Sequence, residues 1–216
     1  FALGIRDGRR CQLRHHRVDR LRIARGFIFE HISRVVGVAH DLGALGAQLE
    51  IEVRDLPRPA GEKALNAAWD AVVRAEQELS VLAAPDAGGK AALSDDLLGL
   101  MRRATSFCTW SDGASGPAGG AVYRLWTRSA RSGALPTPDQ LEEAAATAKC
   151  DRARLSTEAR SIAISPGSEL DLRGFVRGWA VDIAVRTLAD LGATNARVGL
   201  GSVTRGMGAG PGGRGW

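Results

Sequence analysis

The sequence predicts an α+β domain in which helices pack against a mixed sheet. Apolar and polar residues alternate over Gln48–Arg54, as in a half-buried strand. An apolar stripe at helical spacing follows over about 61–82, and further strand-like and helical segments then alternate with hairpin-like and crossover connections. With 216 residues, 44% of them hydrophobic, the chain is long enough for one domain with a buried core. The pattern leaves the order and direction of the strands open.

The first predicted strand and helix have well-marked boundaries. In the strand, Leu49, Ile51 and Val53 point to one face, which must be buried. Prolines at 57 and 59 then interrupt the chain, and the helix is expected over about Gly61–Leu82. We expect Trp69 on its stripe to be a core residue rather than a platform for a ligand. The stripe consists of Leu65, Ala68, Trp69, Val72, Ala75 and Leu79.

The middle of the chain predicts two more helices and two loops. Small turn-forming residues over 83–90 indicate a loop, and a helix is expected to start at Ser94, with two aspartates near its positive end. Residues 110–120 indicate a loop whose composition suits close backbone contacts with a ligand. Thr137-Pro138-Asp139-Gln140 has the form of a capping box, so a helix should run to about Lys149.

The last third predicts a strand, a helix and a second strand. Ser161–Ser165 is a short strand, followed by a turn at Pro166-Gly167. Gly178–Leu191 is an amphipathic helix that Gly192 ends, and Ala196–Leu200 is the next strand.

The positive charge is concentrated at one end of the chain. The net charge is +5, but residues 1–40 hold nine arginines against three acidic residues, a net of +6, so the remainder sums to −1. Such an arm could contact phosphates, or it could be a poorly ordered extension. We favour the extension, because stacking aromatics and a binding motif are missing, and we expect no nucleic-acid partner. The predicted division is therefore an arginine-rich extension over 1–40 and a domain over 41–216.

The cysteines and apolar runs limit what the chain can be. Cys11, Cys108 and Cys150 are widely spaced and indicate neither a disulfide framework nor a zinc site. No apolar run approaches the roughly 20 residues of a membrane span. Cys11 lacks the apolar approach of a lipoprotein anchor, and the chain does not begin with Met, so export stays undecided.

The most informative segment is Leu170–Asp182, which places acids, glycines and a cation where a strand runs into a helix. Glycines at 174 and 178 would let a ligand or metal approach the backbone, while Asp171 and Arg177 could bind its polar groups. The alternative is a tight strand-to-helix connection whose glycines serve only packing.

Three segments together carry a family resemblance. They are the Leu170–Asp182 segment, the loop Ser111–Pro117 with the later Leu125-Trp126, and Gly199–Gly208. In order and spacing they resemble the FAD:protein FMN transferase (ApbE) family, whose members carry D-G-A-F-D-P-T followed by L-x-x-L-W, then D-L-G-G-I-A-K-G-Y-A-V-D, then N-L-G-G-D-I-R-x-x-G. The resemblance covers about residues 42–216 and implies an ApbE-like fold.

The resemblance also implies a reaction and a site. Such enzymes move FMN from FAD to a Thr or Ser hydroxyl of an acceptor protein, release AMP, and use magnesium to neutralise the pyrophosphate. Family members are usually exported, periplasmic and associated with the inner membrane, although this chain shows no anchor. The implied FAD contacts are Leu45, Ala114, Ser115, Gly116, Asp171 and Arg177, and the implied metal contact is the carbonyl oxygen of Gly174.

The chain departs from the family pattern at several positions. Ser115-Gly116 replaces F-D, Arg177 replaces the common Lys, and Leu82 stands where an aromatic residue commonly stacks on the flavin. Ser202-Val203 replaces G-D. The family's H-I-I-D-P-x-T-G stretch and its A-D-x-x-x-T metal ligands would fall beyond Trp216. The expectation is an N-terminal portion or a degenerate copy of a family member that binds FAD weakly and does not transfer FMN alone. The alternative to a transferase is a non-catalytic flavin-binding remnant.

Overall fold

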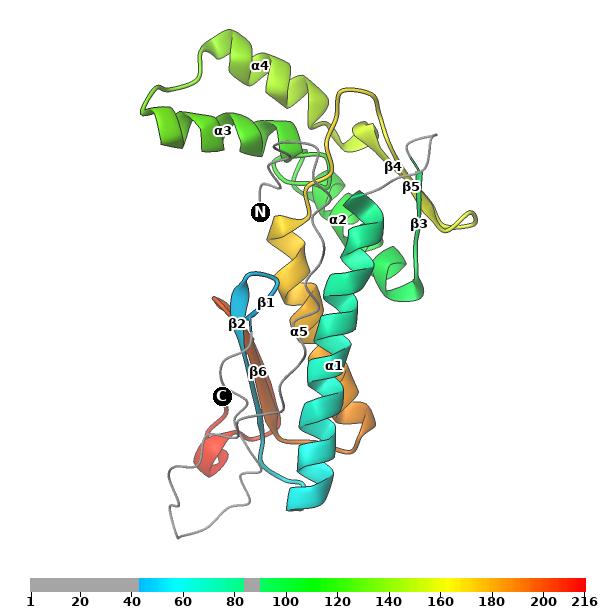
Figure 1. Ribbon diagram of the computed structural model, residues 1–216, viewed down its shortest axis with the longest axis vertical. Coiled ribbons are helices and arrows are strands. Elements are labelled where there is room, and N and C mark those ends of the chain that lie inside the picture. Colours follow the sequence, from blue (N-terminus) through cyan, green and yellow to red (C-terminus); the bar gives the residue numbers. More distant parts are fainter. Residues whose placement is uncertain (1–42, 84–89) are drawn as a thin grey trace, which may run out of the picture. The chain divides into compact units, whose positions relative to one another are not determined.

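The computed structural model describes residues 43–83 and 90–216 (Figure 1). The predictions for the arginine-rich extension over 1–40, including its poor order, lie outside these residues. So does most of the predicted loop over 83–90.

A four-stranded antiparallel sheet has the order β1-β2-β6-β7. Its strands are β1 (Gly43–Ala44), β2 (Ala47–Val53), β6 (Ala196–Leu200) and β7 (Val203–Met207). The two predicted strands are confirmed as β2 and β6, and they pair with Ile51 opposite Val198. Strand β7 was not predicted, because its three central residues are polar or glycine and are exposed.

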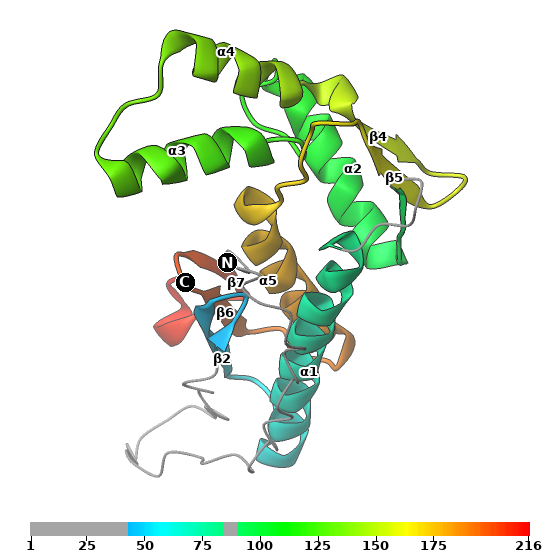
Figure 2. The same ribbon diagram turned by 45° about the horizontal axis from the view of Figure 1, so that its top comes forward.

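Two long helices, α1 (Arg58–Ala83) and α5 (Arg173–Asp190), lie side by side on one face of this sheet (Figures 1 and 2). Helix α1 begins three residues before its predicted start, because the proline at 59 falls in the first turn, where no intrahelical N–H is needed. Between helices and sheet lies the first core, made of small and branched apolar residues: Leu49, Ile51, Val53, Ala64, Leu65, Ala68, Val72, Ala180, Val181, Ala184, Val185, Leu188, Ala193, Ala196, Val198 and Leu200. Trp69 packs against it, as predicted.

The other halves of α1 and α5 enter a second core with α2 (Asp95–Trp110) and a small antiparallel sheet. That sheet has the order β3-β5-β4 and is formed by β3 (Lys90–Ala92), β5 (Ser161–Ile164) and β4 (Ala153–Ser156). The predicted cap of α2 is confirmed, since the Ser94 hydroxyl accepts a hydrogen bond from Leu97 N at 3.2 Å. Helices α1 and α5 thus connect both cores.

Helices α3 (Gly120–Ser132) and α4 (Pro138–Thr147) form a hairpin (Figures 1 and 2). The predicted capping box of α4 is present, with Gln140 N donating to Thr137 Oγ1 at 3.3 Å and Thr137 N donating to Gln140 Oε1 at 3.0 Å. Helix α3 was not predicted, because it begins inside a glycine-rich run. Short 3-10 turns follow at Cys150–Arg152 and Pro211–Gly213.

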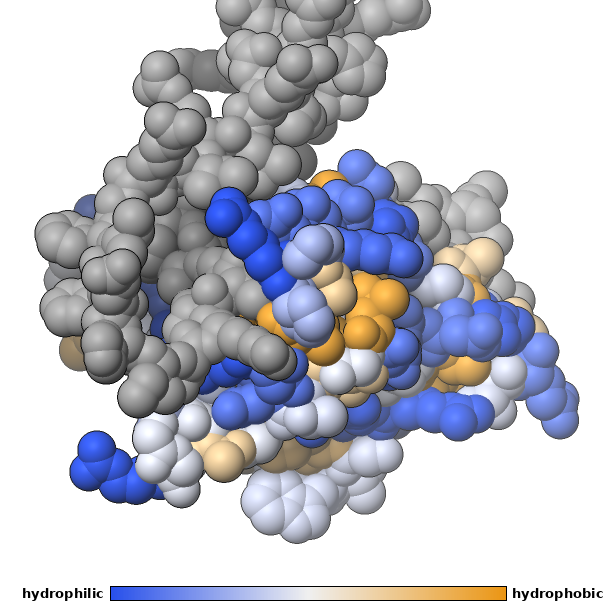
Figure 3. Space-filling model, turned by 90° about the horizontal axis from the view of Figure 1, so that it is seen from below, coloured by the Kyte–Doolittle hydropathy of each residue, from blue (hydrophilic) through white to orange (hydrophobic). Residues whose placement is uncertain are grey.

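One face of the described residues is shown in Figure 3, where hydrophilic residues surround a hydrophobic area. Among the helices of the described part of the chain, none is both long enough and apolar enough to cross a membrane.

Candidate functional site

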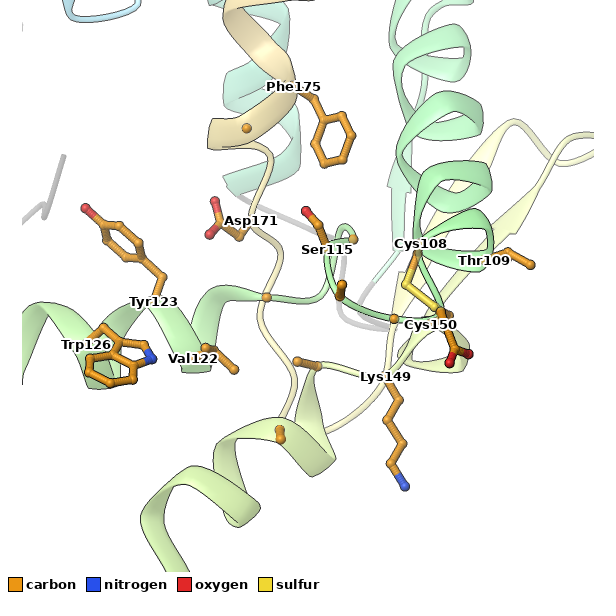
Figure 4. A pocket seen from close by; sticks show the side chains of 18 residues that line it. Cys108, Thr109, Ser115, Val122, Tyr123, Trp126, Lys149, Cys150, Asp171 and Phe175 are labelled. Carbon is orange, nitrogen blue, oxygen red and sulfur yellow. A yellow bond between two sulfur atoms is a disulfide. The ribbon is translucent and has the colours of Figure 1, made fainter. Parts of the chain in front are cut away.

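A cavity of about 800 Å³ opens between the loop after α2, helix α3, the end of α4 and the start of α5 (Figure 4). Five residues singled out from the sequence line it: Ala114, Ser115, Gly116, Asp171 and Gly174. Two segments that are more than 50 positions apart in the sequence therefore meet at one cavity, as the resemblance implies. Leu45 and Arg177 do not line it.

The loop that forms one wall is held by its own hydrogen bonds. Ser111 Oγ donates to Ser115 O at 3.2 Å, and Gly113 N donates to Cys108 O at 2.8 Å. Asp112 and Gly113 both have positive φ, 51° and 79°, so the chain reverses sharply there. The predicted loop is confirmed, and its residues 112–116 line the cavity.

A disulfide between Cys108 and Cys150 forms part of the same wall (Figure 4). The sequence spacing did not indicate it, and that expectation was wrong. The two cysteines are 42 positions apart, but the fold brings the last turn of α2 and the 3-10 turn after α4 together, with 5.7 Å between the Cα atoms. That distance is typical of a disulfide.

Asp171 lies at the opposite wall of the cavity, where it forms an ion pair with Arg173. Arg173 donates from Nε to Asp171 Oδ1 at 2.8 Å and from Nη2 to Oδ2 at 2.6 Å, and its backbone N–H donates to Oδ1 at 3.0 Å. Burial alone would raise the pKa of Asp171, but these hydrogen bonds and the guanidinium charge outweigh it, so the pKa is lowered. The guanidinium also lies over the Tyr123 ring.

The start of α5 presents backbone to the cavity. Helix α5 begins at Arg173, five residues before its predicted start, which brings the glycines at 174 and 178 into its first turns. A Cβ at either glycine would meet no heavy atom within 4 Å, so neither glycine is required by packing against the described residues. The positive end of a helix dipole therefore faces the cavity at Gly174.

Leu45 and Arg177 lie at the end of the larger sheet instead. Leu45 forms the β1–β2 turn with a φ of 49°, and its N–H donates to Glu76 Oε1 at 3.1 Å. The guanidinium of Arg177 lies beside the turn between β6 and β7. Its Nη1 atom is 3.6 Å from the position that a Cβ on Gly201 would occupy. Within residues 43–83 and 90–216, Arg177 has no ion-pair partner. It lies one helical turn from Gly174, so the first turns of α5 connect the cavity to the sheet end.

Four further residues that line the cavity were not assigned to a site from the sequence. Tyr123, Trp126 and Phe175 supply aromatic surface, and Lys149 supplies a cation (Figure 4). Tyr123 and Trp126 are three positions apart on α3, a spacing that would have indicated one helix face had the helix been recognised. Leu82 does not line the cavity and packs against the second core.

The donor groups at the cavity do not fit a magnesium ion. Magnesium takes oxygen ligands in octahedral geometry. Gly174 offers one backbone carbonyl oxygen, and the Asp171 carboxylate is already bound by Arg173, which leaves Asp112 as the one other carboxylate among the lining residues. No cluster of three His, Cys, Asp or Glu side chains suited to a metal occurs in the described part of the chain.

Comparison with known proteins shows consistent similarities. The model of the ApbE family matches residues 45–216. The FAD:protein FMN transferase of Treponema pallidum (strain Nichols) is 33% identical in an alignment of 141 residues that covers 60% of this chain and 38% of that protein.

Solved structures of two flavin transferases share the fold. The apo form of ApbE from Pseudomonas stutzeri aligns with a TM-score of 0.69 at 18% identity, over 88% of this chain and 62% of that one. ApbE from Vibrio cholerae aligns with a TM-score of 0.66 at 21% identity, over 86% of this chain and 63% of that one. The chain thus spans less than two thirds of the length of these relatives.

Proposed function

The chain belongs to the ApbE family, and from that premise we propose that it supplies the FAD-binding part of an FAD:protein FMN transferase. The proposed reaction moves FMN from FAD to a Thr or Ser hydroxyl of an acceptor protein and releases AMP. The observation that carries the proposal is the cavity where the 112–116 loop, Asp171 and the start of α5 meet.

The cavity has groups suited to an extended dinucleotide. Aromatic rings at Tyr123, Trp126 and Phe175 can stack on a planar ring. The N-terminus of α5 and Lys149 favour negative charge, as a pyrophosphate requires. Arg177, one turn along α5, would extend this positive surface toward Leu45 at the sheet end.

Asp171 is proposed as an orienting residue. Because its pKa is lowered, its carboxylate is ionised at neutral pH. Both oxygens already accept hydrogen bonds from Arg173, so its capacity for a ligand hydroxyl is limited to the remaining lone pairs. A ligand that binds there meets a fixed carboxylate–guanidinium pair rather than a free acid.

Magnesium is part of the family proposal, but the described residues do not hold it, and we derive no step through it. We therefore expect FAD to bind this 216-residue chain with the same affinity in magnesium and in a chelator. The measurement is a titration of flavin fluorescence under both conditions. A tenfold gain in affinity with magnesium would show that Gly174, Asp112 and Asp171, or a larger donor set, do hold the ion.

A non-catalytic flavin-binding role is the second candidate. The observation that favours it is that no histidine lies among the described residues at the cavity, whose two acidic residues are Asp112 and Asp171. All four histidines lie within residues 1–40 of the sequence, and Asp171 is ion-paired. A general base within hydrogen-bond reach typically contributes about two to four powers of ten in rate.

The proposed site can be tested by FAD binding with matched aromatic variants. Tyr123→Ala and Trp126→Ala should each weaken binding about tenfold, since stacking on an aromatic ring is worth about 1–3 kcal/mol per base. Trp110→Ala is the control, because Trp110 is 79% exposed and does not line the cavity. Equal losses in all three variants, or no FAD binding by the unaltered chain, would overturn the site.

The two functions are separated by a transfer assay. The chain is incubated with FAD, magnesium and a Thr-containing acceptor, and the acceptor is examined for an added FMN mass. We expect FAD binding without labelling from this chain alone. Stoichiometric labelling would show that the residues of this chain suffice for transfer.

We also propose that the chain works in an oxidising compartment, such as the periplasm. The disulfide between Cys108 and Cys150 supports this, because disulfides persist in exported proteins and are rare in the reducing cytosol. The test is the thiol count of the chain isolated from its native cell under alkylating conditions. Quantitative alkylation of both cysteines would contradict the proposal.

A further inference from the structure

The Cys108–Cys150 disulfide lies where two walls of the cavity meet. Cys108 is 1% exposed in the last turn of α2, and Cys150 opens the 3-10 turn that follows α4. Both cysteines line the cavity, as do Ala148 and Lys149 beside them. The bond therefore joins the wall made by the end of α4 to the wall made by the loop after α2.

The loop rests directly on this bond. A Cβ at Gly116 would lie 2.5 Å from Cys108 Sγ and 2.7 Å from Cys108 Cβ. The backbone of Gly116 therefore packs closely against the cysteine side chain. The carbonyl oxygen of Cys108 accepts a hydrogen bond from Gly113 N at 2.8 Å. Both the side chain and the backbone of residue 108 thus set the position of the loop.

Within the described part of the chain, few buried residues hold the α4 wall. Gly120 is the one buried residue of α3, and Ala144 is the one buried residue of α4. The start of α3 is tied to the segment before α5 through Gly120 N and Glu169 O at 3.1 Å. The C-terminal end of α4 is held by the disulfide instead. The bond takes the place of the buried apolar contacts that usually hold a helix against its neighbours.

We propose that the Cys108–Cys150 pair is a positioning element of the ligand site, so that the disulfide form binds FAD more tightly than the dithiol form. This inference rests on the proposed function for the identity of the ligand. The positioning itself depends only on the geometry of the loop. The pair does not contact the reacting atoms and acts through the placement of residues 111–116.

Reduction follows thiol–disulfide exchange with a small dithiol. The S–S bond breaks, each cysteine sulfur gains one proton and one electron, and the dithiol becomes its cyclic disulfide. Because affinity and redox state are linked, FAD must stabilise the disulfide by the same factor by which the disulfide strengthens FAD binding. A tenfold difference in affinity therefore lowers the midpoint potential of the pair by about 30 mV in saturating FAD.

The experiment uses the whole chain with Cys11→Ser, so that only this pair titrates. Amide hydrogen exchange is measured for the disulfide and dithiol forms, followed by FAD affinity and the midpoint potential with and without FAD. We expect at least tenfold faster exchange at Gly113 and Ser115 in the dithiol form, with unchanged exchange in β2 and β6. We also expect about tenfold weaker FAD binding and the matching potential shift.

A second variant keeps the test sharp if the dithiol form unfolds. Gly116→Ala pushes the loop off Cys108 while the disulfide stays intact, and it should weaken FAD binding to a similar degree. Gly99→Ala is the control, since a Cβ there meets nothing within 4 Å.

The outcomes separate the two claims. Unchanged exchange at Gly113 and Ser115 on reduction overturns the positioning role. Faster exchange with equal FAD affinity and no potential shift overturns the link to the ligand. Absence of FAD binding by the disulfide form overturns the proposed function, while the exchange data still decide the positioning.

Discussion

Asp171 and Arg173 form the most tightly specified side-chain pair at the site. Three hydrogen bonds from one residue fix both carboxylate oxygens, and Tyr123 supports the guanidinium from α3. Charge-assisted bidentate pairs of this kind are among the strong hydrogen bonds in proteins. The site thus presents a preset geometry rather than a pair of free ions.

The lowered pKa of Asp171 predicts a pH dependence. Its stabilising contribution is present above the unfolded pKa of about 3.9 and is lost as the pH falls through the lower folded value. The Asp171–Arg173 ion pair should therefore stay intact at the ordinary pKa of an aspartate and be lost only at lower pH, as the pH falls through the folded pKa. The carboxyl carbon chemical shift of Asp171, followed by NMR, measures this directly.

Arg173→Gln is the matched variant for that titration. Burial raises the pKa of Asp171, and the hydrogen bonds and charge of Arg173 lower it. Removing the guanidinium takes away most of the lowering effect, so the pKa of Asp171 should rise. An unchanged titration curve would show that Arg173 does not hold the carboxylate in solution.

The close contact between Gly116 and Cys108 leaves no room for a side chain at position 116. Gly116→Ala should destabilise the chain by about 1–3 kcal/mol, the usual cost of overpacking, because its Cβ would meet the Cys108 side chain. Gly174→Ala is the control, since its Cβ meets nothing within 4 Å. Urea unfolding measures both, and equal stability of the two variants would contradict the close contact.

At the scale of elements, the glycines in helices differ in purpose. Gly178 lies in α5 with open space where a Cβ would be. Gly120 opens α3, and a Cβ there would lie 2.6 Å from Glu169 Cβ and 2.9 Å from Glu169 O. The first tolerates a side chain, and the second is needed for a close backbone approach.

Two alanine substitutions test this difference. Gly178→Ala should stabilise the chain by about 0.5–1 kcal/mol, because alanine has the higher helix propensity. Gly120→Ala should destabilise it by separating α3 from the segment before α5. Thermal unfolding distinguishes the two signs, and a loss of stability in Gly178→Ala would contradict the open space at this position.

At the scale of the whole molecule, α1 and α5 join two cores, and only one of these cores borders the site. The first core, beside the larger sheet, contains fully buried side chains such as Leu49, Ile51 and Leu188. The second core carries the cavity at its edge, with Leu172 and Trp179 buried beneath the start of α5. Ion pairs also connect the elements, since Asp182 of α5 pairs with Arg103 of α2 and with Arg205 of β7.

The disulfide closes a 42-residue separation that contains α3, α4 and the site loop. The chain-entropy relation gives about 4 kcal/mol of stabilisation for a loop of this length. The double variant Cys108→Ala, Cys150→Ala should lose stability of that order in urea unfolding. Full stability of the variant would show that the hairpin is held by other contacts.

The sequence by itself determined the elements with strong local patterns. Alternation marked β2, apolar spacing marked α1, and the Ser94 and Thr137 caps marked α2 and α4, because these signals arise from neighbouring residues. The motifs also indicated that the 112–116 loop and Asp171 share a site, through the family resemblance. Strands β3, β4 and β7 and helix α3 carry weak patterns, since they are short, exposed or rich in glycine.

Only the tertiary structure decided which residues meet. It paired Cys108 with Cys150, placed Tyr123 and Trp126 at the cavity, and left Leu45 and Arg177 at the sheet end. It also showed that Arg173 occupies the Asp171 carboxylate. Sequence spacing cannot supply these facts, because distances between segments depend on how helices and sheets pack, while local propensity fixes only the segments themselves.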